Sequence, residues 1–354
     1  MKAMIMAAGV GSRLMPLTIG VPKPMVPMAN RPLMENIIQL LDEHGFSQVI
    51  ANLHYHADCI ENYFGNSPRP GMTLLYSREE ELMGTAGGVK KCQWFLDDTF
   101  VVISGDALTD IDLTSLMQEH RRQGALATIA VKTVDEVERY GIVVTDSNGR
   151  ISSFQEKPRP EEALSNLANT GIYIFEPEIF DYIPPEQFYD FGKQVFPHLV
   201  KIKAPFFAAA IDDYWCDVGS LDTYRQAHND ILQGKVRVPV AGTVKRTAQA
   251  NILIGAGAVI DEDVQMYGNV IIGPGCHISR GAVLEECILW ERVQVSEKAQ
   301  LHGCVLGDNC QVGSHSVLEG GTVVAGGCLI GSGMHIGEGH KVTQVKPGQL
   351  EIEK

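Results

Sequence analysis

Residues 1–27, MKAMIMAAGVGSRLMPLTIGVPKPMVP, join an apolar run to a glycine-containing loop. The apolar run predicts a strand, and Gly9 and Gly11 leave backbone N–H groups uncovered just beyond its carboxyl end. A phosphate group can approach such a loop closely. The loop is not a dinucleotide fingerprint, because Leu14 stands where a third glycine is needed, and it lacks the GK[ST] of a P-loop.

Two cations follow the loop, Arg13 directly and Lys23 between two prolines. A pyrophosphate leaving group and an α-phosphorus under attack both require charge neutralisation, which such cations provide. Either residue alone would be read as a solvated surface charge. The combined string of glycines, cations and prolines instead favours triphosphate chemistry.

Apolar runs alternate with helix-like segments as far as about residue 235, which predicts βα units around a largely parallel sheet. One helix is expected to start at Pro32 and to place Leu33, Ile37, Leu40 and Leu41 on one face. Another is expected to begin at Leu113 and to end at Gly124. The five expected strands span residues 1–8, 48–53, 72–76, 99–104 and 126–132.

A period of six residues starts at Ile254 and continues to Val342. Sixteen aliphatic positions keep this count, with two five-residue steps, from Leu284 to Leu289 and from Leu301 to Leu306, where turns are expected. The pattern resembles the hexapeptide-repeat, left-handed parallel β-helix, in which triangular coils stack aliphatic ladders inside. Three cysteines fall four residues after a ladder position, where the pattern favours small core side chains: Cys276, Cys310 and Cys328.

The composition excludes several classes of protein. With 29 Lys and Arg against 43 Asp and Glu, the net charge is −14, whereas a general nucleic-acid scaffold needs a basic face. No run approaches the ~20 consecutive apolar residues of a membrane span, and a signal-peptide pattern is missing. Eight cysteines without CxxC pairs indicate free thiols. We expect a cytoplasmic protein without nucleic-acid or membrane partners.

Two aspartates are the candidate ligands for Mg²⁺. Asp106 follows the buried strand in VVISGDALTDID and is expected at the carboxyl edge of the sheet, beside the phosphate loop. Asp110 and Asp112 are rivals that are more simply explained as turn and N-cap residues. Asp217, in DDYWCDVGS, is the second candidate, because two carboxylates leave coordination sites for phosphate oxygens and water.

The string AAGVGSRLMPLTIGVPKPMVP closely resembles the signature of the sugar-1-phosphate nucleotidyltransferases, and this resemblance spans the whole chain. The later blocks are most similar to mannose-1-phosphate guanylyltransferases and related glucose-1-phosphate enzymes. The resemblance implies that an NTP and a sugar 1-phosphate give an NDP-sugar and pyrophosphate, assisted by Mg²⁺. GTP and mannose 1-phosphate are the leading substrates, and UTP, dTTP or ATP with glucose 1-phosphate are the alternatives.

The resemblance also implies roles for individual residues. The catalytic residues would be Arg13, Lys23 and Asp106, and the metal ligands Asp106 and Asp217. The nucleotide would contact Ala8, Gly9, Gly11, Ser12, Arg13, Lys23, Gly84, Thr85, Ala86 and Asp106. The sugar phosphate would contact Gly141, Glu156, Lys157, Asn169, Thr170 and Lys193.

These patterns predict an α/β fold with two domains and several shorter segments. We expect a Rossmann-like nucleotidyltransferase domain with a mostly parallel mixed sheet, followed by the β-helix, whose flat faces and open ends favour a homo-oligomer. The expected bounds are 1–235 for the catalytic domain, 236–250 for a linker, 251–345 for the β-helix and 346–354 for a C-terminal tail.

Three alternatives stay open at this point. The histidines of the β-helix could serve an acyltransferase as a general base. The N-terminal half could be a non-catalytic nucleotide-sugar-binding module, although the set of Arg13, Lys23, Asp106 and Asp217 favours catalysis. His54 and His56 could form a metal pair, but a loop after a strand explains them as well.

Overall fold

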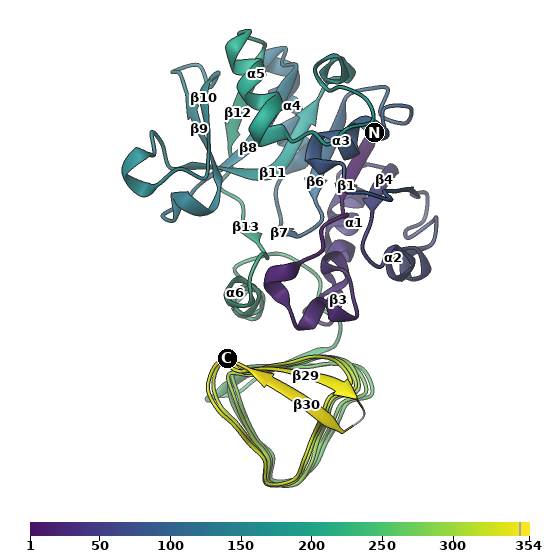
Figure 1. Cartoon of the computed structure of the whole chain (residues 1–354), viewed down its shortest axis with the longest axis vertical. Coiled ribbons are helices and arrows are strands. Elements are labelled where there is room, and N and C mark those ends of the chain that lie inside the picture. Colours follow the sequence, from purple (N-terminus) through teal and green to yellow (C-terminus); the bar gives the residue numbers. More distant parts are fainter. Residues whose placement is uncertain (347) are drawn as a thin grey trace. The chain divides into compact units, whose positions relative to one another are not determined.

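The computed structural model describes residues 1–346 and 348–354, and it consists of two compact units (Figure 1). The first unit contains residues 1–10 and 34–217, and the second unit contains residues 11–33 and 218–354. No helix in the described part of the chain is long and apolar enough to cross a membrane.

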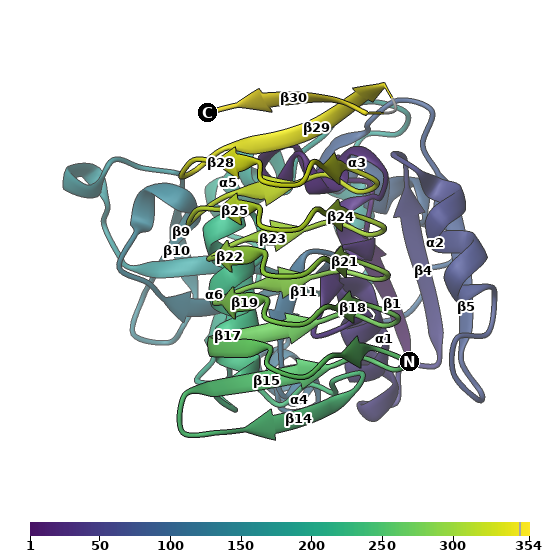
Figure 2. The same ribbon diagram turned by 90° about the horizontal axis from the view of Figure 1, so that it is seen from below.

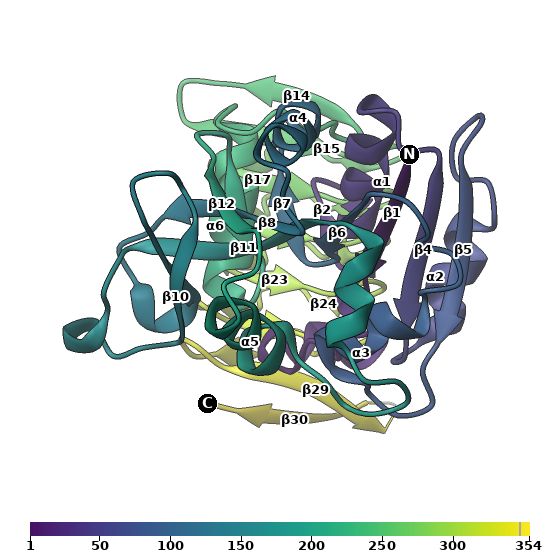
Figure 3. The same ribbon diagram turned by 90° about the horizontal axis from the view of Figure 1, so that it is seen from above.

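The first unit is built on a mixed nine-stranded sheet. Its centre is parallel: β1 (Lys2–Met6) lies between β4 (Gln48–Leu53) and β6 (Phe100–Ser104), and β5 (Thr73–Arg78) pairs with β4. Figure 3 shows β5, β4, β1 and β6 side by side in this order. The remaining strands are β8 (Ala127–Thr133), β9 (Gly141–Thr145), β10 (Ile151–Glu156), β11 (Leu167–Phe175) and β12 (Phe206–Ala210). All five predicted strands are confirmed.

Antiparallel pairing enters the sheet through β11, which runs opposite to β6, β8 and β9. A separate two-stranded ribbon joins β7 (Ala107–Thr109) to β13 (Trp215–Asp217). Both predicted helices form, as α1 (Leu33–Glu43) and α4 (Leu113–Gln123). The other helices are α2 (Ala57–Phe64), α3 (Gly84–Lys91), α5 (Phe196–Lys201) and α6 (Leu221–Leu232).

The ends of α4 follow from local chemistry. The Asp112 carboxylate accepts a hydrogen bond from the Ser115 backbone N–H at 2.9 Å, which caps the first turn. Gly124 ends the helix with φ of 58°, a conformation that costs glycine little. The expected N-cap role of Asp112 is therefore confirmed.

The second unit contains the β-helix, whose coils are stacked from β15 to β29 in Figure 2. Pairing is parallel and follows the predicted ladders, since Ile254, Ile272, Leu289, Leu306 and Val324 occupy equivalent positions in successive coils. One face carries β15 (Ala250–Ile254), β17 (Gln265–Ile272), β20 (Ile288–Leu289), β23 (Val305–Leu306), β26 (Val323–Val324) and β29 (Lys341–Lys346). The second carries β16 (Val259–Ile260), β18 (His277–Ile278), β21 (Gln294–Val295), β24 (Gln311–Val312) and β27 (Leu329–Ile330). The third carries β19 (Val283–Glu285), β22 (Gln300–His302), β25 (Val317–Leu318) and β28 (His335–Ile336), which continue from β17.

The two five-residue steps are corners, as predicted. The left-handed residue of these corners, Glu286 (φ 49°) or Gly303 (φ 56°), comes two residues after the ladder position. In a six-residue step, such as that from Ile272 to Ile278, it comes three residues after it, at Gly275 (φ 65°). Residues 236–250, expected as a linker, include β14 (Thr243–Arg246), which pairs with β15. The expected C-terminal tail includes β30 (Gln349–Glu353), which pairs with β29.

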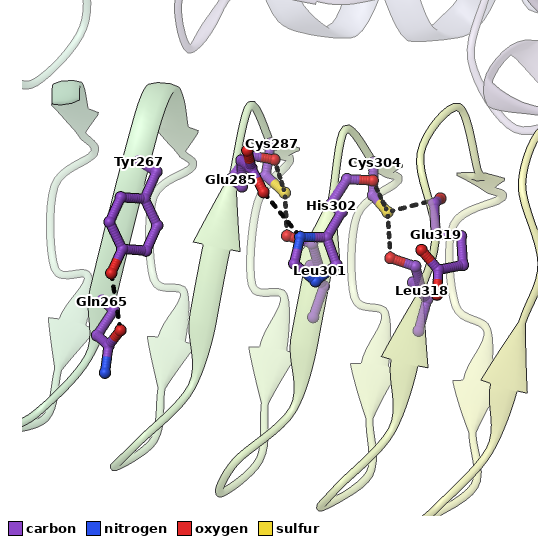
Figure 4. Close-up of polar contacts among 9 residues, drawn as sticks. All are labelled: Gln265, Tyr267, Glu285, Cys287, Leu301, His302, Cys304, Leu318 and Glu319. Carbon is purple, nitrogen blue, oxygen red and sulfur yellow. Dashed lines mark hydrogen bonds and ion pairs between the residues drawn. The ribbon is translucent and has the colours of Figure 1, made fainter. Parts of the chain in front are cut away.

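The thiols of the β-helix belong to its core. Cys276, Cys310 and Cys328 are fully buried, and each Sγ donates to a backbone carbonyl of the next coil, as Cys276 does to Trp290 at 2.9 Å. Figure 4 shows the same arrangement for Cys287 and Cys304. Burial raises the pKa of the Cys276 thiol to about 11, so it stays protonated at neutral pH. All eight cysteines are free thiols.

Candidate active site

A pocket of about 170 Å³ lies in the first unit, where the sheet and the β7–β13 ribbon meet. It contains both predicted metal ligands, Asp106 and Asp217, together with two of the predicted sugar contacts, Asn169 and Thr170. Its other lining residues are Ser104, Ala107, Tyr140, Gly171 and Trp215. The structure therefore brings together residues that are more than a hundred positions apart in the sequence.

The backbone explains why the two carboxylates meet. Beyond the carboxyl end of β6, the Gly105 N–H donates to the Met6 carbonyl at 2.8 Å, and a Cβ at Gly105 would lie only 2.7 Å from that oxygen. This glycine allows the chain to pass close to β1 and then to present Asp106. Asp217 pairs directly with Ala107, the next residue, in the antiparallel ribbon. The Ser104 hydroxyl donates to the Asp106 carboxylate.

This pair of carboxylates suits Mg²⁺, which prefers oxygen ligands and keeps several positions for water and phosphate oxygens. Within the described residues no group of three or more His, Cys, Asp or Glu side chains could hold a metal ion. A two-carboxylate site of this kind would need oxygens from the substrate to complete it. Asp110, the rival candidate for metal binding, makes a structural hydrogen bond instead: its carboxylate accepts from the Tyr214 backbone N–H at 2.9 Å.

Two aromatic residues of the pocket were missed by the sequence reasoning. The rings of Tyr140 and Trp215 lie 5.3 Å apart in an edge-on arrangement, and the Trp215 Nε1–H donates to the Thr170 carbonyl at 2.9 Å. Burial raises the pKa of the Tyr140 hydroxyl. The charge of Arg139 lowers this pKa, whereas the charge of Asp217 raises it further. The hydroxyl therefore stays protonated at neutral pH. The only local signal was position, because Trp215 lies within the string DDYWCDVGS and Tyr140 directly precedes Gly141.

The polar atoms of Asn169 and Thr170 are already held by the protein. Asn169 donates to the Tyr173 hydroxyl at 3.0 Å and accepts from the Gly171 N–H at 3.0 Å. The buried Thr170 hydroxyl donates to the Ala130 carbonyl at 2.7 Å. Thr170 therefore shapes the pocket with its backbone, and its hydroxyl is occupied by the sheet.

Glu156, at the end of β10, lies against two glycines. A Cβ at Gly141 would come within 3.2 Å of the Glu156 carboxylate, and one at Gly192 within 2.7 Å. The Glu156 side chain reaches solvent, but partial burial of its carboxyl raises its pKa above the usual value. The charge of Asp190 also raises this pKa, whereas the nearby cations Lys157 and Lys193 lower it. The glycines thus leave room for a carboxylate that has two cations nearby, Lys157 and Lys193.

The segment expected to bind the nucleobase is held by Asp190, which sequence reasoning also missed. The Thr85 hydroxyl donates to the Asp190 carboxylate at 2.9 Å, and the same carboxylate accepts from the Lys193 N–H at 3.1 Å. Gly84 (φ 74°) passes so close to the Tyr189 carbonyl that a Cβ would lie 2.5 Å from it. Thr85 of the predicted nucleobase segment and Lys193, a predicted sugar-phosphate contact, therefore both bind Asp190, which precedes the π-helix η7 (Phe191–Val195).

A buried network supports the loop beyond β1. The Ala7 N–H donates to the Asn52 side chain at 2.9 Å, and Asn52 donates to Glu79 at 2.7 Å. Glu79 also accepts from the Met83 N–H at 3.0 Å, just before α3. A Cβ at Gly9 would meet nothing within 4 Å, so the protein's own packing does not demand glycine there. That a phosphate group binds at Gly9 stays a prediction.

Arg13 and Lys23 belong to the second unit. Arg13 is exposed in η1 (Ser12–Leu14), whereas Lys23, which opens η3 (Lys23–Met25), is 6% exposed. Gly11 (φ 73°) packs against the stem of Lys23, because a Cβ would lie 2.9 Å from the Lys23 Cβ. That the two cations converge with Asp106 and Asp217 on one nucleotide stays a prediction.

The chain beyond Lys23 is held by the buried His228 of α6. The Ala29 N–H donates to His228 Nε2 at 3.2 Å, and His228 Nδ1–H donates to the Tyr224 carbonyl at 3.0 Å. A carbonyl can only accept and an N–H can only donate, so the imidazole is neutral with its proton on Nδ1. Burial lowers the pKa of His228 to about 4.

This histidine predicts a pH dependence of stability. Between about pH 6.5 and 4 the unfolded chain binds a proton at this position and the folded chain does not, so the free energy of unfolding decreases as pH falls. The full contribution is roughly 3 kcal/mol. In urea unfolding at a series of pH values, His228→Gln should lose less stability over this range than the original protein. Parallel losses in the two proteins would contradict the prediction.

Three histidines of the β-helix contact acidic side chains of a neighbouring coil. His302 contacts Glu285 at 2.9 Å across two coils (Figure 4), His335 contacts Glu319 at 3.0 Å and His277 contacts Asp261 at 3.5 Å. Each pair joins neighbouring coils at the surface. These contacts explain the three histidines as links between coils.

Comparisons with known proteins find similar sequences for both parts of the chain. Residues 2–234 match the family model described as nucleotidyl transferase, and residues 238–336 match the model described as the EIF2B subunit epsilon LbH domain. The chain is 42% identical over 332 residues to the UTP–glucose-1-phosphate uridylyltransferase of Synechocystis sp., covering 85% of this chain and 86% of that protein. It is 30% identical over 322 residues to the probable mannose-1-phosphate guanylyltransferase 3 of Oryza sativa subsp. japonica, covering 87% and 86%.

A solved structure matches the fold over about two thirds of this chain. The crystal structure of HddC from Yersinia pseudotuberculosis complexed with GMP-PN matches with a TM-score of 0.56 and 26% identity, covering 65% of this chain and 99% of that one.

Proposed function

We propose that this chain, which belongs to the nucleotidyl transferase family and is a sugar-1-phosphate nucleotidyltransferase, transfers the uridylyl group of UTP to glucose 1-phosphate and releases pyrophosphate. The uridylyltransferase of Synechocystis sp. supports this choice, because it is 42% identical whereas the rice guanylyltransferase is 30% identical. The expectation of GTP and mannose 1-phosphate therefore becomes the second candidate. The observation that favours GTP and mannose 1-phosphate is the similarity of the later sequence motifs to those of mannose-1-phosphate guanylyltransferases.

The presence of Asp106 and Asp217 in one pocket supports the proposed reaction. A phosphate oxygen of the sugar 1-phosphate attacks the α-phosphorus of the NTP, forming a new P–O bond as the bond to the β-phosphate oxygen breaks. The electron pair of that bond leaves with pyrophosphate. Since the attacking phosphate is ionised near neutral pH, catalysis comes from placement and charge compensation, without a general base.

The roles proposed for the remaining residues follow from their charge and position. Arg13 holds the β- and γ-phosphates, and Lys23 stabilises the α-phosphate between the two substrates. Asp106 and Asp217 would hold Mg²⁺, and the ion would supply positive charge to offset that of the phosphates. The loop from Ala8 to Ser12 cradles the triphosphate, and residues 84–86 border the base. The sugar phosphate contacts Gly141, Glu156, Lys157, Asn169, Thr170 and Lys193.

A grid of reactions tests this proposal. GTP, UTP, dTTP and ATP would each be combined with glucose 1-phosphate and mannose 1-phosphate, with and without Mg²⁺, and pyrophosphate release would be measured. We expect the highest kcat/KM for UTP with glucose 1-phosphate in the presence of Mg²⁺. A maximum at GTP with mannose 1-phosphate would establish the second candidate, and no pyrophosphate in any combination would refute the proposed activity.

Replacement of Glu156 by alanine should mainly impair use of the sugar phosphate. The carboxylate can accept hydrogen bonds from sugar hydroxyls, so we expect the KM for sugar 1-phosphate to rise roughly 10-fold, the effect of one lost charge-assisted hydrogen bond. The KM for the NTP should change little. Glu161→Ala is the matched control, since this exposed glutamate lies beside Arg159 in the segment that follows β10. An unchanged preference among sugar phosphates in Glu156→Ala would contradict the assignment.

A further inference from the structure

The chain that follows Lys23 forms a short hairpin in the second unit. Strands β2 (Pro27–Met28) and β3 (Arg31–Pro32) pair antiparallel, and the two turn residues, Ala29 (φ 51°) and Asn30 (φ 66°), both have left-handed backbone conformations. A two-residue turn of this type fits the right-handed twist of the flanking strands. The hairpin begins four residues after Lys23, so anything that holds it also limits where Lys23 can lie.

A chain of hydrogen bonds connects this hairpin to the β-helix. The Trp290 Nε1–H donates to the Tyr224 hydroxyl at 2.9 Å, and that hydroxyl donates to the Pro27 carbonyl at 2.7 Å. Tyr224 is fully buried and Trp290 is 4% exposed. The Tyr224 hydroxyl thus accepts from Trp290 and donates to Pro27. Because the hydroxyl is buried, loss of either hydrogen bond would be costly.

Asn30 makes a second, independent connection. Its side-chain amide donates to the Ile272 carbonyl at 3.0 Å and to the Ala241 carbonyl at 3.2 Å. Ile272 is a ladder residue of β17, inside the stacked coils. The Ala241 N–H in turn donates to the Ala29 carbonyl at 3.1 Å. The hairpin turn is therefore held by backbone groups on both sides.

Little freedom remains between the hairpin and Lys23. The Val26 N–H donates to the Lys23 carbonyl at 3.2 Å, and the Leu33 N–H donates to the Val26 carbonyl at 3.1 Å. Proline occupies both positions next to Lys23 and fixes φ there. A shift of the Pro27 carbonyl would consequently be passed on to Lys23 rather than absorbed by the intervening residues.

We infer that Tyr224 and Trp290 are positioning residues for Lys23, so that the β-helix sets the rate of nucleotidyl transfer through the Tyr224 hydroxyl. This inference rests on the proposed function, in which Lys23 stabilises the α-phosphate. A displacement of about 1 Å at a reacting centre can lower a rate roughly 10²-fold. The β-helix would thus contribute to turnover without contacting the substrates.

Tyr224→Phe removes the shared hydroxyl and Trp290→Phe removes only its donor. We expect Tyr224→Phe to lower kcat roughly 10-fold or more with the KM for both substrates within about threefold, because placement rather than binding is lost. Trp290→Phe should have the same sign and a smaller effect. Amide hydrogen exchange of the peptide covering residues 23–30 should become faster in Tyr224→Phe.

Ser316→Ala is the matched control. The buried Ser316 hydroxyl also donates to backbone carbonyls, those of Gly313 at 2.7 Å and Gly331 at 2.9 Å, but it lies elsewhere in the β-helix. Its loss should lower the melting temperature comparably and leave kcat unchanged below that temperature. This control separates positioning from a general loss of stability.

Two results would overturn the inference: an unchanged kcat in Tyr224→Phe, whatever happens to exchange at residues 23–30, or an equal fall of kcat in Tyr224→Phe and Ser316→Ala. Failure of the proposed function would look different, because the unaltered protein would then release no pyrophosphate. In that case unchanged exchange at residues 23–30 in Tyr224→Phe would still refute the structural step, and faster exchange would support it.

Discussion

Lys23→Ala is expected to lower kcat by roughly 10²-fold or more while changing the KM for either substrate much less, because a charge that stabilises the transition state is lost. The side chain is 6% exposed and is packed against Gly11, so its stem is held along a defined path. An ammonium that is fixed before the reaction costs no reorganisation as charge develops on the phosphates. Steady-state release of pyrophosphate with both substrates varied would measure the effect.

Folding and local charge must be controlled in this experiment. Circular dichroism and the melting temperature of Lys23→Ala would show whether the buried position tolerates the smaller side chain. Lys245→Ala removes an exposed lysine from β14 of the same unit and should leave kcat unchanged. Near-normal turnover in a folded Lys23→Ala protein would remove this residue from the mechanism.

Asp106→Asn is expected to have an effect of similar size, roughly 10²-fold or more on kcat, because the substitution removes a charged oxygen ligand while keeping the shape of the side chain. The Mg²⁺ concentration that gives half-maximal activity should also rise. A direct titration with Mn²⁺ as a probe in the presence of nucleotide would report metal binding independently of turnover.

The pairing of two carboxylates makes this prediction sharper. If Asp106 and Asp217 hold the same ion, the double variant should lose little more than either single variant, since residues that act as a unit are not additive. Asp212→Asn, which changes an exposed carboxylate near the same ribbon, should have no effect. Multiplicative losses from Asp106→Asn and Asp217→Asn would argue for two separate roles.

The features that the sequence predicts well are those that follow from a local periodic pattern of aliphatic residues. A period of six residues fits neither a helix nor an ordinary strand, so the ladders from Ile254 to Val342 could be placed residue by residue. The corners after Leu284 and Leu301 were visible as shortened steps for the same reason. Asp106 was placed correctly at the sheet edge because parallel strands end together.

Features that depend on pairing between distant segments were not predictable in this way. The role of Asp190 could be recognised only from the packing of α3 against η7. That of Tyr140 could be recognised only from the approach of β9 to the β7–β13 ribbon. Asn52 and Glu79 form a buried network whose two halves carry no shared motif. Substrate preference belongs to the same class, since it depends on the shape of a pocket rather than on the order of residues.

The two shortened corners have a consequence for how the β-helix could change in length. Residues inside a flat face alternate between core and solvent, so one inserted or deleted residue there would turn every following aliphatic side chain outward. At these two corners the chain bends from one face to the next at Glu286 and Gly303, and the ladder residues that follow stay paired with those of the neighbouring coils. Insertions of variable length can therefore protrude from these two bends, which makes them the natural attachment points for peptide tags or fused domains.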